Sequence, residues 1–265
     1  RVIGCQGSFH GRSFALLAAA GAEAYLRGFG PVMDGFDHVA FNNLNEMRAA
    51  VTDHTAAILV EPVQGEGGVR APSADYLKGL RAICDESGAL LLVDEVQTGM
   101  GRLGRFLGQD GSGVRGDAIA LAKGLGGGVP IGAMLTTEAL GGALPPGTHG
   151  STFGGNALAC AASLAVIAIL DEEKLVVGAR EKGEVLGRML AKVAADLPKV
   201  CEGARGDGLL RGLVLREGFV ARDILPRVQD RGVLLTAAGE RVLRFSPPLI
   251  VSFQQLEEGV RAVQH

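Results

Sequence analysis

Residues 89–97 read Ala89-Leu-Leu-Leu-Val-Asp94-Glu-Val-Gln97, in which five apolar residues end at an acid. A short, continuous apolar run of this kind is typical of a strand buried on both faces of a parallel sheet. Three further runs have the same character, and they cover residues 56–60, 118–122 and 131–135. The four runs therefore predict a parallel β-sheet.

The segment between residues 60 and 89 has helical periodicity. Its apolar residues recur from Tyr76 to Cys84 at the spacing of one helix face, and Pro72-Ser73 precedes them as the expected cap. Alternation of strand, helix and strand predicts a doubly wound α/β fold. Ligands of such sheets bind beyond the carboxyl ends of the strands. Glu61, Asp94 and Lys123 stand at such ends.

The second half of the chain has a different organisation. We expect an apolar helix over 156–170 and a charged amphipathic helix over 179–197. A smaller α+β unit follows, with expected strands at 209–215, 233–236 and 242–245 and expected helices at 220–231 and 254–263. We place the domain boundary near residue 172, which gives a large ligand-binding domain (1–172) and a small C-terminal domain (173–265).

The composition excludes several classes of protein. The net charge is −3 and the basic residues are dispersed, which argues against nucleic acid or an anionic membrane as partner. No apolar run reaches the roughly 20 residues of a membrane span. The cysteines form no C-x-x-C pair, so we expect no metal site and a reducing, cytoplasmic location; they are Cys5, Cys84, Cys160 and Cys201.

Two charged residues at strand ends are candidates for chemistry. Asp94 is either a solvated surface carboxylate or a buried one, and a buried one needs a cationic partner. Lys123 is followed by four glycines within five positions. It is either a surface lysine before a flexible turn or a desolvated amine with a lowered pKa, which is a usable nucleophile.

Rival motifs fail at particular positions. Gly124-Leu-Gly-Gly-Gly-Val129 imitates the start of a dinucleotide fingerprint, but Pro130 stands where a helix should continue. No lysine follows a P-loop pattern, and no G-x-S-x-G elbow occurs. His149-Gly-Ser-Thr-Phe-Gly-Gly-Asn156 leads into a helix and is either a phosphate site or a simple cap.

Six stretches together resemble the class III pyridoxal-phosphate aminotransferases of fold type I, in particular the acetylornithine/ornithine branch. This resemblance implies an α/β fold with a mostly parallel sheet, flanking helices and a smaller C-terminal α+β domain. The stretches are Ser8-Phe-His-Gly-Arg12, Val60-Glu-Pro-Val-Gln-Gly-Glu66-Gly-Gly, Asp94-Glu-Val-Gln97, Ala122-Lys123-Gly, Gly150-Ser-Thr-Phe-Gly-Gly-Asn156 and Arg244-Phe-Ser-Pro-Pro-Leu249.

The resemblance implies a role for each cofactor-binding residue. Lys123 would hold pyridoxal 5′-phosphate as a Schiff base, and Asp94 would keep the pyridine nitrogen protonated. Phe9 and Val96 would cover the two ring faces, and Gln97 would bind the ring hydroxyl.

Three further residues complete the implied cofactor set. His10 and Ser151 count among the cofactor-binding residues. Thr152 would reach the phosphate of the neighbouring subunit, so the resemblance implies a homodimer.

Three charged residues would bind substrate. Arg12 would grip the α-carboxylate, for which a planar guanidinium is suited. Glu66 and Arg244 resemble a switch in which the arginine is neutralised for a basic amino donor and released for 2-oxoglutarate. A static salt bridge explains the pair equally well.

The implied reaction moves the ω-amino group of N-acetylornithine or ornithine to 2-oxoglutarate and gives a semialdehyde and glutamate, as in arginine biosynthesis. A 4-aminobutyrate or succinylornithine aminotransferase remains an alternative. The chain opens on an apolar run at Val2, without the family's N-terminal segment and its phosphate-binding loop. We therefore expect a fragment, and an inactive remnant that only binds a partner is the alternative from another class.

Overall fold

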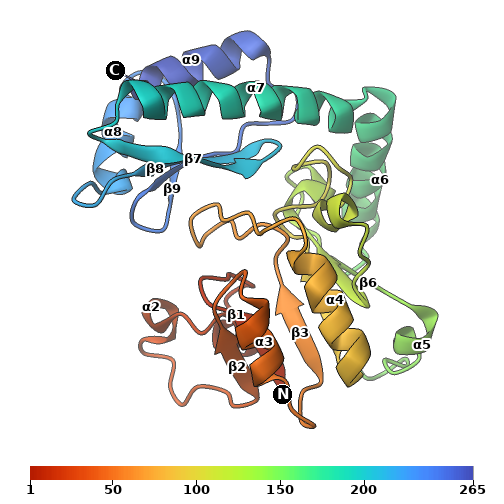
Figure 1. The fold of residues 1–265 in the computed structure, drawn as a ribbon. Coiled ribbons are helices and arrows are strands. Elements are labelled where there is room, and N and C mark those ends of the chain that lie inside the picture. The colour runs from red at the N-terminus through yellow and green to blue at the C-terminus, as the bar shows by residue number, and fades with distance from the viewer. Residues whose placement is uncertain (265) are drawn as a thin grey trace.

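The computed structural model describes residues 1–264, and it is built around a six-stranded sheet (Figure 1). The strands are β1 (Val2–Cys5), β2 (Phe36–Val39), β3 (Ala57–Val60), β4 (Leu90–Asp94), β5 (Ala118–Leu121) and β6 (Ala133–Thr136), in the order β2-β1-β3-β4-β5-β6. The first five run parallel. The mixed α/β fold with a mostly parallel sheet is therefore confirmed.

The strand direction expected for residues 131–135 was wrong. Strand β6 pairs with β5 antiparallel, and its side chains are exposed. A parallel neighbour needs a crossover of a dozen or more residues, usually a helix. Between β5 and β6 lies only the short 3₁₀ helix η2 (Lys123–Gly126), so the chain reverses instead.

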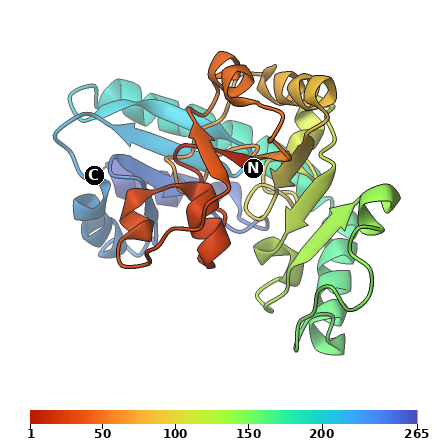
Figure 2. The same ribbon diagram turned by 90° about the horizontal axis from the view of Figure 1, so that it is seen from below.

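Helices cover both faces of this sheet (Figure 2). On one face lie α3 (Leu44–Ala50) and α4 (Tyr76–Ser87), and on the other lie α1 (Phe14–Ala20) and α2 (Glu23–Leu26). The apolar face of α4 buries Tyr76, Leu80 and Ile83 against β3 and β4. Ser73 does not cap this helix, because Asp75 is the N-cap residue and the Ser73 hydroxyl donates to Asn42.

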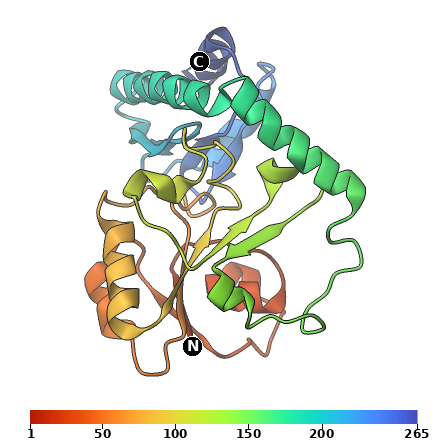
Figure 3. The same cartoon turned by 90° about the vertical axis from the view of Figure 1, so that its right-hand side faces the viewer.

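A long helical connection leads from this sheet to a second one (Figure 3). It consists of α5 (Glu138–Gly141), α6 (Ala157–Glu172) and α7 (Leu175–Asp196), and the last of these packs on the second sheet. Helix α6 is almost entirely apolar, yet most of its side chains are exposed.

The second sheet is antiparallel with the order β7-β8-β10-β9. Its elements are β7 (Cys201–Asp207), β8 (Leu210–Leu215), β9 (Thr236–Ala238) and β10 (Val242–Phe245), with α8 (Ala221–Gln229) and α9 (Phe253–Gln264). The strand expected at 233–236 begins only at Thr236, and β7 was not predicted.

The parallel strands of the first sheet end on the side that faces the second sheet. In Figure 1 the arrowhead of β3 is directed toward the smaller sheet. Arg102, in the loop between β4 and the 3₁₀ helix η1 (Gly108–Ser112), donates to the carbonyl oxygens of Leu209 and Pro247.

No helix within residues 1–264 is long and apolar enough to cross a membrane.

Candidate active site

A cavity of about 310 Å³ lies beyond the carboxyl ends of β1, β3, β4 and β5. These four strands are consecutive and parallel, so the segments that follow them meet at one edge. The lining residues are Phe9, His10, Gly11, Glu61, Glu66, Asp94, Val96, Gln97, Ala122 and Lys123. The structure thus brings Asp94 and Lys123 to one cavity.

Asp94 is a buried carboxylate with two partners. One oxygen lies 2.7 Å from Nδ1 of His10, and the other accepts the Val96 N–H at 3.0 Å. The side chain of His10 is 1% exposed, and its Nε2 has no hydrogen-bond partner among residues 1–264. The imidazole of His10 is thus a hydrogen-bond partner of Asp94, and a cationic ligand in the cavity would supply the charge that burial of Asp94 requires.

Lys123 is the first residue of η2, at the sharp turn that follows β5. Its backbone is left-handed, with φ of 46°. This conformation costs a non-glycine residue about 1 kcal/mol or more. Gly127, also left-handed at φ 58°, lies against Val166 of α6, so η2 packs closely on that helix.

A second cavity, also of about 310 Å³, lies next to the first. The two share Val96, Gln97 and Lys123, so the lysine lies between them. The other lining residues are Gly99, Met100, Arg102, Gly124, Val166, Leu170, Ser246 and Leu249. The larger sheet, α6 and the segment after β10 therefore all contribute to the surroundings of Lys123.

The residues expected to cover and orient a ring lie on the cavity wall. Phe9 makes an edge contact with Tyr25, with ring centroids 5.6 Å apart, which fixes its orientation. Gln97 lies against Gly65 so closely that a Cβ there would overlap its amide oxygen. Glycine at position 65 thus makes room for Gln97.

Arg12 is exposed and stands beside the cavity. Its guanidinium lies over the rings of Phe9 and Tyr25, at 5.8 Å and 5.5 Å from their centroids. Stacking on aromatic faces orients a guanidinium and leaves its N–H groups, which lie in the guanidinium plane, available for hydrogen bonds.

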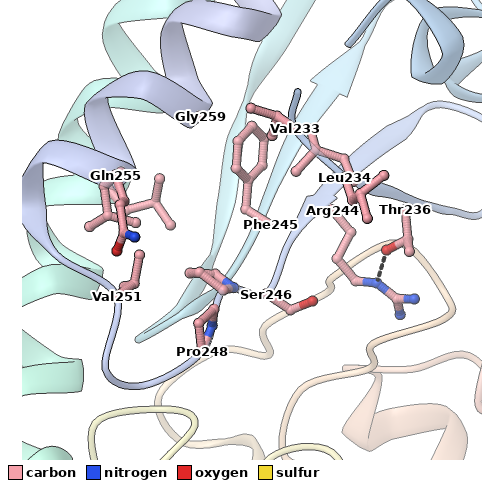
Figure 4. A pocket seen from close by; sticks show the side chains of 14 residues that line it. Val233, Leu234, Thr236, Arg244, Phe245, Ser246, Pro248, Val251, Gln255 and Gly259 are labelled. Carbon is pink, nitrogen blue, oxygen red and sulfur yellow. Dashed lines mark hydrogen bonds between the residues drawn. The ribbon is translucent and has the colours of Figure 1, made fainter. Parts of the chain in front are cut away.

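Glu66 and Arg244 form an ion pair across the two sheets. Nη1 of Arg244 lies 2.6 Å from Glu66, and its Nε donates to the hydroxyl of Thr236 at 3.0 Å. Arg244 is 9% exposed and the Glu66 side chain is 33% exposed. Figure 4 shows Arg244 at the edge of a separate hollow of about 260 Å³, with its guanidinium pointing away from the apolar side chains.

Ser151 and Thr152 do not line the cavity. Both are exposed, in the loop before α6, and the Ser151 hydroxyl accepts the N–H of Gly154. Asn156 caps α6 by accepting the Ala159 N–H. The structure therefore shows the capping role of this segment within one chain.

Glu61 lines the cavity but was not assigned a role from the sequence. It is 5% exposed, and its carboxylate accepts the N–H groups of Phe9 and Gly65 at 3.0 Å and 3.3 Å. Burial raises its pKa to about 7, against the opposing effect of His10. The signal in the sequence was its place after an apolar run, the same signal that marked Asp94.

Comparison with known proteins gives a consistent result. The family model described as "Aminotransferase class-III" matches residues 1–265. The acetylornithine aminotransferases of Gloeobacter violaceus and Myxococcus xanthus are 46% and 48% identical over 264 and 257 residues. These alignments cover 100% and 97% of this chain but only 66% and 64% of those proteins.

Solved structures show the same fold. The ornithine aminotransferase of Toxoplasma gondii superposes with a TM-score of 0.95 at 33% identity, over 100% of this chain and 63% of that one. A transaminase from Virgibacillus superposes with a TM-score of 0.93 at 28% identity, over 100% and 66%. The chain thus spans less than two thirds of the length of these relatives. Sequence, fold and site agree that it belongs to the class III aminotransferase family.

Proposed function

We propose that this chain forms the main part of a pyridoxal-phosphate-dependent transaminase acting on N-acetylornithine or ornithine. The ω-amino group would pass to 2-oxoglutarate, giving a semialdehyde and glutamate, as in arginine biosynthesis. The observation that carries the proposal is one cavity lined by Lys123, the Asp94–His10 pair and Glu66, the ion-pair partner of Arg244. The relatives named acetylornithine aminotransferase support the choice of substrate.

The residues present fit a pyridoxal ring. Asp94 is a buried acceptor suited to a protonated ring nitrogen, and Nε2 of His10 has no hydrogen-bond partner within residues 1–264, which supports a further polar partner at this site. Phe9 and Val96 provide apolar contacts for the ring, and Lys123 provides an amine.

Four residues of the cavity would each have a defined task toward the cofactor. Lys123 would hold the cofactor through Nζ. Asp94 would keep a proton at the ring nitrogen, and His10 would keep Asp94 in place. Gln97 would donate to the ring hydroxyl. When bound, pyridoxal phosphate supplies an electron-accepting ring.

Lys123 would also move the proton of the reaction. Its Nζ, released by an incoming amino donor, would act as the general base that takes the proton from the substrate carbon. The left-handed turn at Lys123 and the packing of η2 on α6 would hold the amine at the position this transfer requires.

Substrate selection would fall to three charged residues. Arg12 would bind the α-carboxylate of the amino donor. Glu66 would neutralise Arg244 while a basic donor occupies the site, and would release it to bind the distal carboxylate of 2-oxoglutarate. The 2.6 Å ion pair supports the first of these states.

We also propose a homodimer in which Thr152 reaches the partner's cavity, with Ser151 beside it. Both residues are exposed and lie outside this chain's own cavity. The apolar side chains exposed nearby support an interface: Phe153, Leu158, Leu164, Ile167 and Ile169.

We also propose a domain boundary near residue 172 and a cytoplasmic location. The change from one sheet to the other occurs between α6 and α7, which supports a domain boundary near residue 172. All four cysteines are free, which supports a reducing, cytoplasmic location.

The test of the proposed function is a comparison of Lys123→Ala with the parent. Turnover of N-acetylornithine, ornithine and 4-aminobutyrate with 2-oxoglutarate is measured beside the visible absorbance of the Schiff base between Lys123 and the cofactor, in this chain and in the longer gene product if its gene continues upstream. We expect Lys123→Ala to abolish both signals. Undiminished turnover in the variant, or a parent that never acts on an ω-amine, would refute the proposal.

A further inference from the structure

The loop that carries Glu66 reaches from the larger sheet to the smaller one. Gln64 and Arg70 pair across its base, where the Gln64 N–H donates to the Arg70 carbonyl at 3.0 Å and the Arg70 N–H donates back at 2.9 Å. The residues between them, 65–69, form the tip, which lies beneath the smaller sheet in Figure 1. Residues 64–70 are called the Glu66 loop below.

Val69 attaches the tip of the Glu66 loop to the smaller sheet. Its side chain is fully buried, in an apolar cluster with Leu210 and other residues of that sheet. A Cβ at Gly206 would lie 2.8 Å from Val69 and one at Gly212 would lie 3.2 Å from it, so these two glycines leave the space that Val69 fills. The backbone of Val69 is left-handed, with φ of 53°, which a β-branched residue adopts only where its surroundings hold it.

Arg205 of β7 makes a second attachment beside the first. It stands opposite Gly212 in the pairing of β7 with β8. Its Nε donates to the carbonyl oxygen of Gly68 at 2.7 Å, and a Cβ at Gly68 would lie 2.6 Å from its Nη2, so the guanidinium lies directly against the loop. Within residues 1–264 this is the one hydrogen bond that the Arg205 side chain makes.

These attachments determine where Glu66 stands. Glu66 is two residues before Gly68, and its carboxylate meets Arg244 of β10, in the same sheet as Arg205. Since the Glu66 side chain is 33% exposed, packing around it does not fix its position. The position of the carboxylate depends instead on the loop backbone, which Arg205 and Val69 hold independently of the ion pair.

We propose that Arg205 is a positioning residue that holds the Glu66 loop on the smaller sheet, so that Glu66 meets Arg244 when a basic amino donor is bound. The proposal rests on the proposed function, because it gives Arg205 a part in the choice between the two substrates. When 2-oxoglutarate opens the ion pair, Arg205 keeps the loop in place, and only the Glu66 side chain moves. Without Arg205 the ion pair forms less often, and Arg244 is available to an acidic substrate more often. Loss of Arg205 therefore has opposite effects on the two substrates.

The first readout is the steady-state kinetics of Arg205→Met, which keeps an apolar stem and removes the hydrogen bond to the loop. KM for the basic donor should rise about fivefold and KM for 2-oxoglutarate should fall about twofold, with kcat little changed. Arg205→Lys keeps a charged donor and should restore most of the parent's values. General damage to the fold raises both KM values or lowers kcat alone, and either result overturns the proposal.

Arg211→Met is the matched control. Arg211 of the neighbouring strand β8 is also partly buried, and its guanidinium also donates to two backbone carbonyl groups, but these belong to the β7–β8 hairpin and not to the Glu66 loop. This variant should keep both KM values of the parent, and shifts equal to those of Arg205→Met would contradict the proposal. If Arg205→Met does not fold, Val69→Ala loosens the same attachment from the loop side and should shift both KM values in the same directions.

The second readout needs neither cofactor nor substrate. The unfolding equilibrium constant of the full chain is measured in urea for Arg205→Met, for Glu66→Gln and for the double variant. If Arg205 places Glu66, then Glu66→Gln should have an effect at least about threefold smaller in the Arg205→Met background than in the parent. In the Arg211→Met background its effect should equal that in the parent.

An effect of Glu66→Gln that is the same with and without Arg205 would show independent roles and would overturn the proposal. A parent that acts on no ω-amine refutes the proposed function instead, and the urea measurements still decide the role of Arg205.

Discussion

Glu66 lies where the choice between two unlike substrates would be made. Its partner Arg244 is almost fully buried and has Thr236 as its other neighbour, so removal of the carboxylate leaves the guanidinium without a counterion. We expect Glu66→Gln to raise KM for the basic donor about tenfold and to lower KM for 2-oxoglutarate. Steady-state kinetics of both half-reactions measure this.

The control is an ion pair of the same type at the surface. Arg241 and Glu202 are 3.3 Å apart and both are exposed, so Glu202→Gln should change neither KM. Equal effects on donor and acceptor in Glu66→Gln would instead identify a static salt bridge.

Asp117 is a structural carboxylate at the start of β5. Burial raises its pKa, but the Arg81 guanidinium at 2.7 Å and the Leu91 N–H outweigh this effect, and the pKa lies below its ordinary value. Asp117 thus stabilises the fold above its unfolded pKa of 3.8, and this contribution is lost as pH falls through the lower, folded value. Asp117→Asn should destabilise by about 2 kcal/mol near neutral pH.

Urea unfolding as a function of pH checks this prediction. The difference between Asp117→Asn and the parent should shrink as pH falls below the unfolded pKa. Asp85→Asn is the control, because Asp85 pairs with the same Arg81 but is exposed. It should cost less than about 0.5 kcal/mol, and a similar loss in both variants would contradict the argument.

The sequence pattern alone predicts some residues of the candidate site and not others, for a physical reason. Asp94 and Lys123 end buried strands, and the geometry of a parallel sheet alone brings such ends together. Arg12 and Arg244 carry no local signal, and only the family resemblance marked them. Glu61 stood at a strand end too, but its contacts with Phe9 come from a loop 52 residues away, which no local pattern reports.

At the scale of single elements, η2 depends on its glycines. A Cβ on Gly127 would lie 2.8 Å from Val166, and φ is 58°. Gly127→Ala should therefore destabilise by about 2 kcal/mol and weaken cofactor binding, because it displaces the turn at Lys123.

A glycine with the same backbone but free space serves as control. Gly88, which ends α4, has φ of 76°, and no atom lies within 4 Å of the point where a Cβ would stand. Gly88→Ala should cost about 1 kcal/mol through the backbone alone and leave cofactor affinity unchanged. Thermal unfolding and the cofactor titration distinguish the two variants.

Helix α6 exposes an apolar surface that water does not favour. Leu164 is 69% exposed, in a helix without a charged residue before Asp171. If this surface is a dimer interface, Leu164→Glu should raise the dimer dissociation constant at least about 100-fold. Leu234→Glu, at an 81% exposed site near β9, should leave it unchanged. Sedimentation velocity of a parent that stays monomeric at every concentration would contradict the prediction.

The strands missing from the sequence-based prediction are held by pairing rather than marked by composition. Strand β7 reads Cys-Glu-Gly-Ala-Arg-Gly-Asp and has no apolar run, but β8 supplies its hydrogen-bond partners. Strand β2 has only four residues, Phe-Asp-His-Val, and it is paired by β1. The runs that were predicted correctly in position, such as β3 and β4, are buried on both faces.

At the scale of the whole molecule, Arg102 links the two units through side-chain hydrogen bonds. It is largely buried, and its Nη1 donates to two carbonyl groups of the smaller unit, those of Leu209 and Pro247. Arg102→Met keeps the apolar stem and removes both bonds. We expect a loss of about 2 kcal/mol in the free energy of unfolding, and separate rather than coincident unfolding of the two units.

Arg216 provides the comparison within one unit. It is exposed and donates to the carbonyl of Pro198, so Arg216→Met should leave unfolding cooperative. Denaturation followed by two probes, one placed in each unit, separates these results. Coincident transitions in Arg102→Met would show that the remaining contacts between the units, among them the apolar cluster that includes Leu103 and Leu210, suffice to couple them.

The Glu66–Arg244 pair has a mechanical consequence as well as a chemical one. Glu66 belongs to a loop of the larger sheet and Arg244 to a strand of the smaller one, so the bond spans the two bodies. A substrate that separates the pair also removes one tether between them. In the proposed reaction, the link between the two sheets would then be stiffer while the amino donor is bound than while 2-oxoglutarate is bound. The half-reaction with 2-oxoglutarate would therefore be the more sensitive to solvent viscosity.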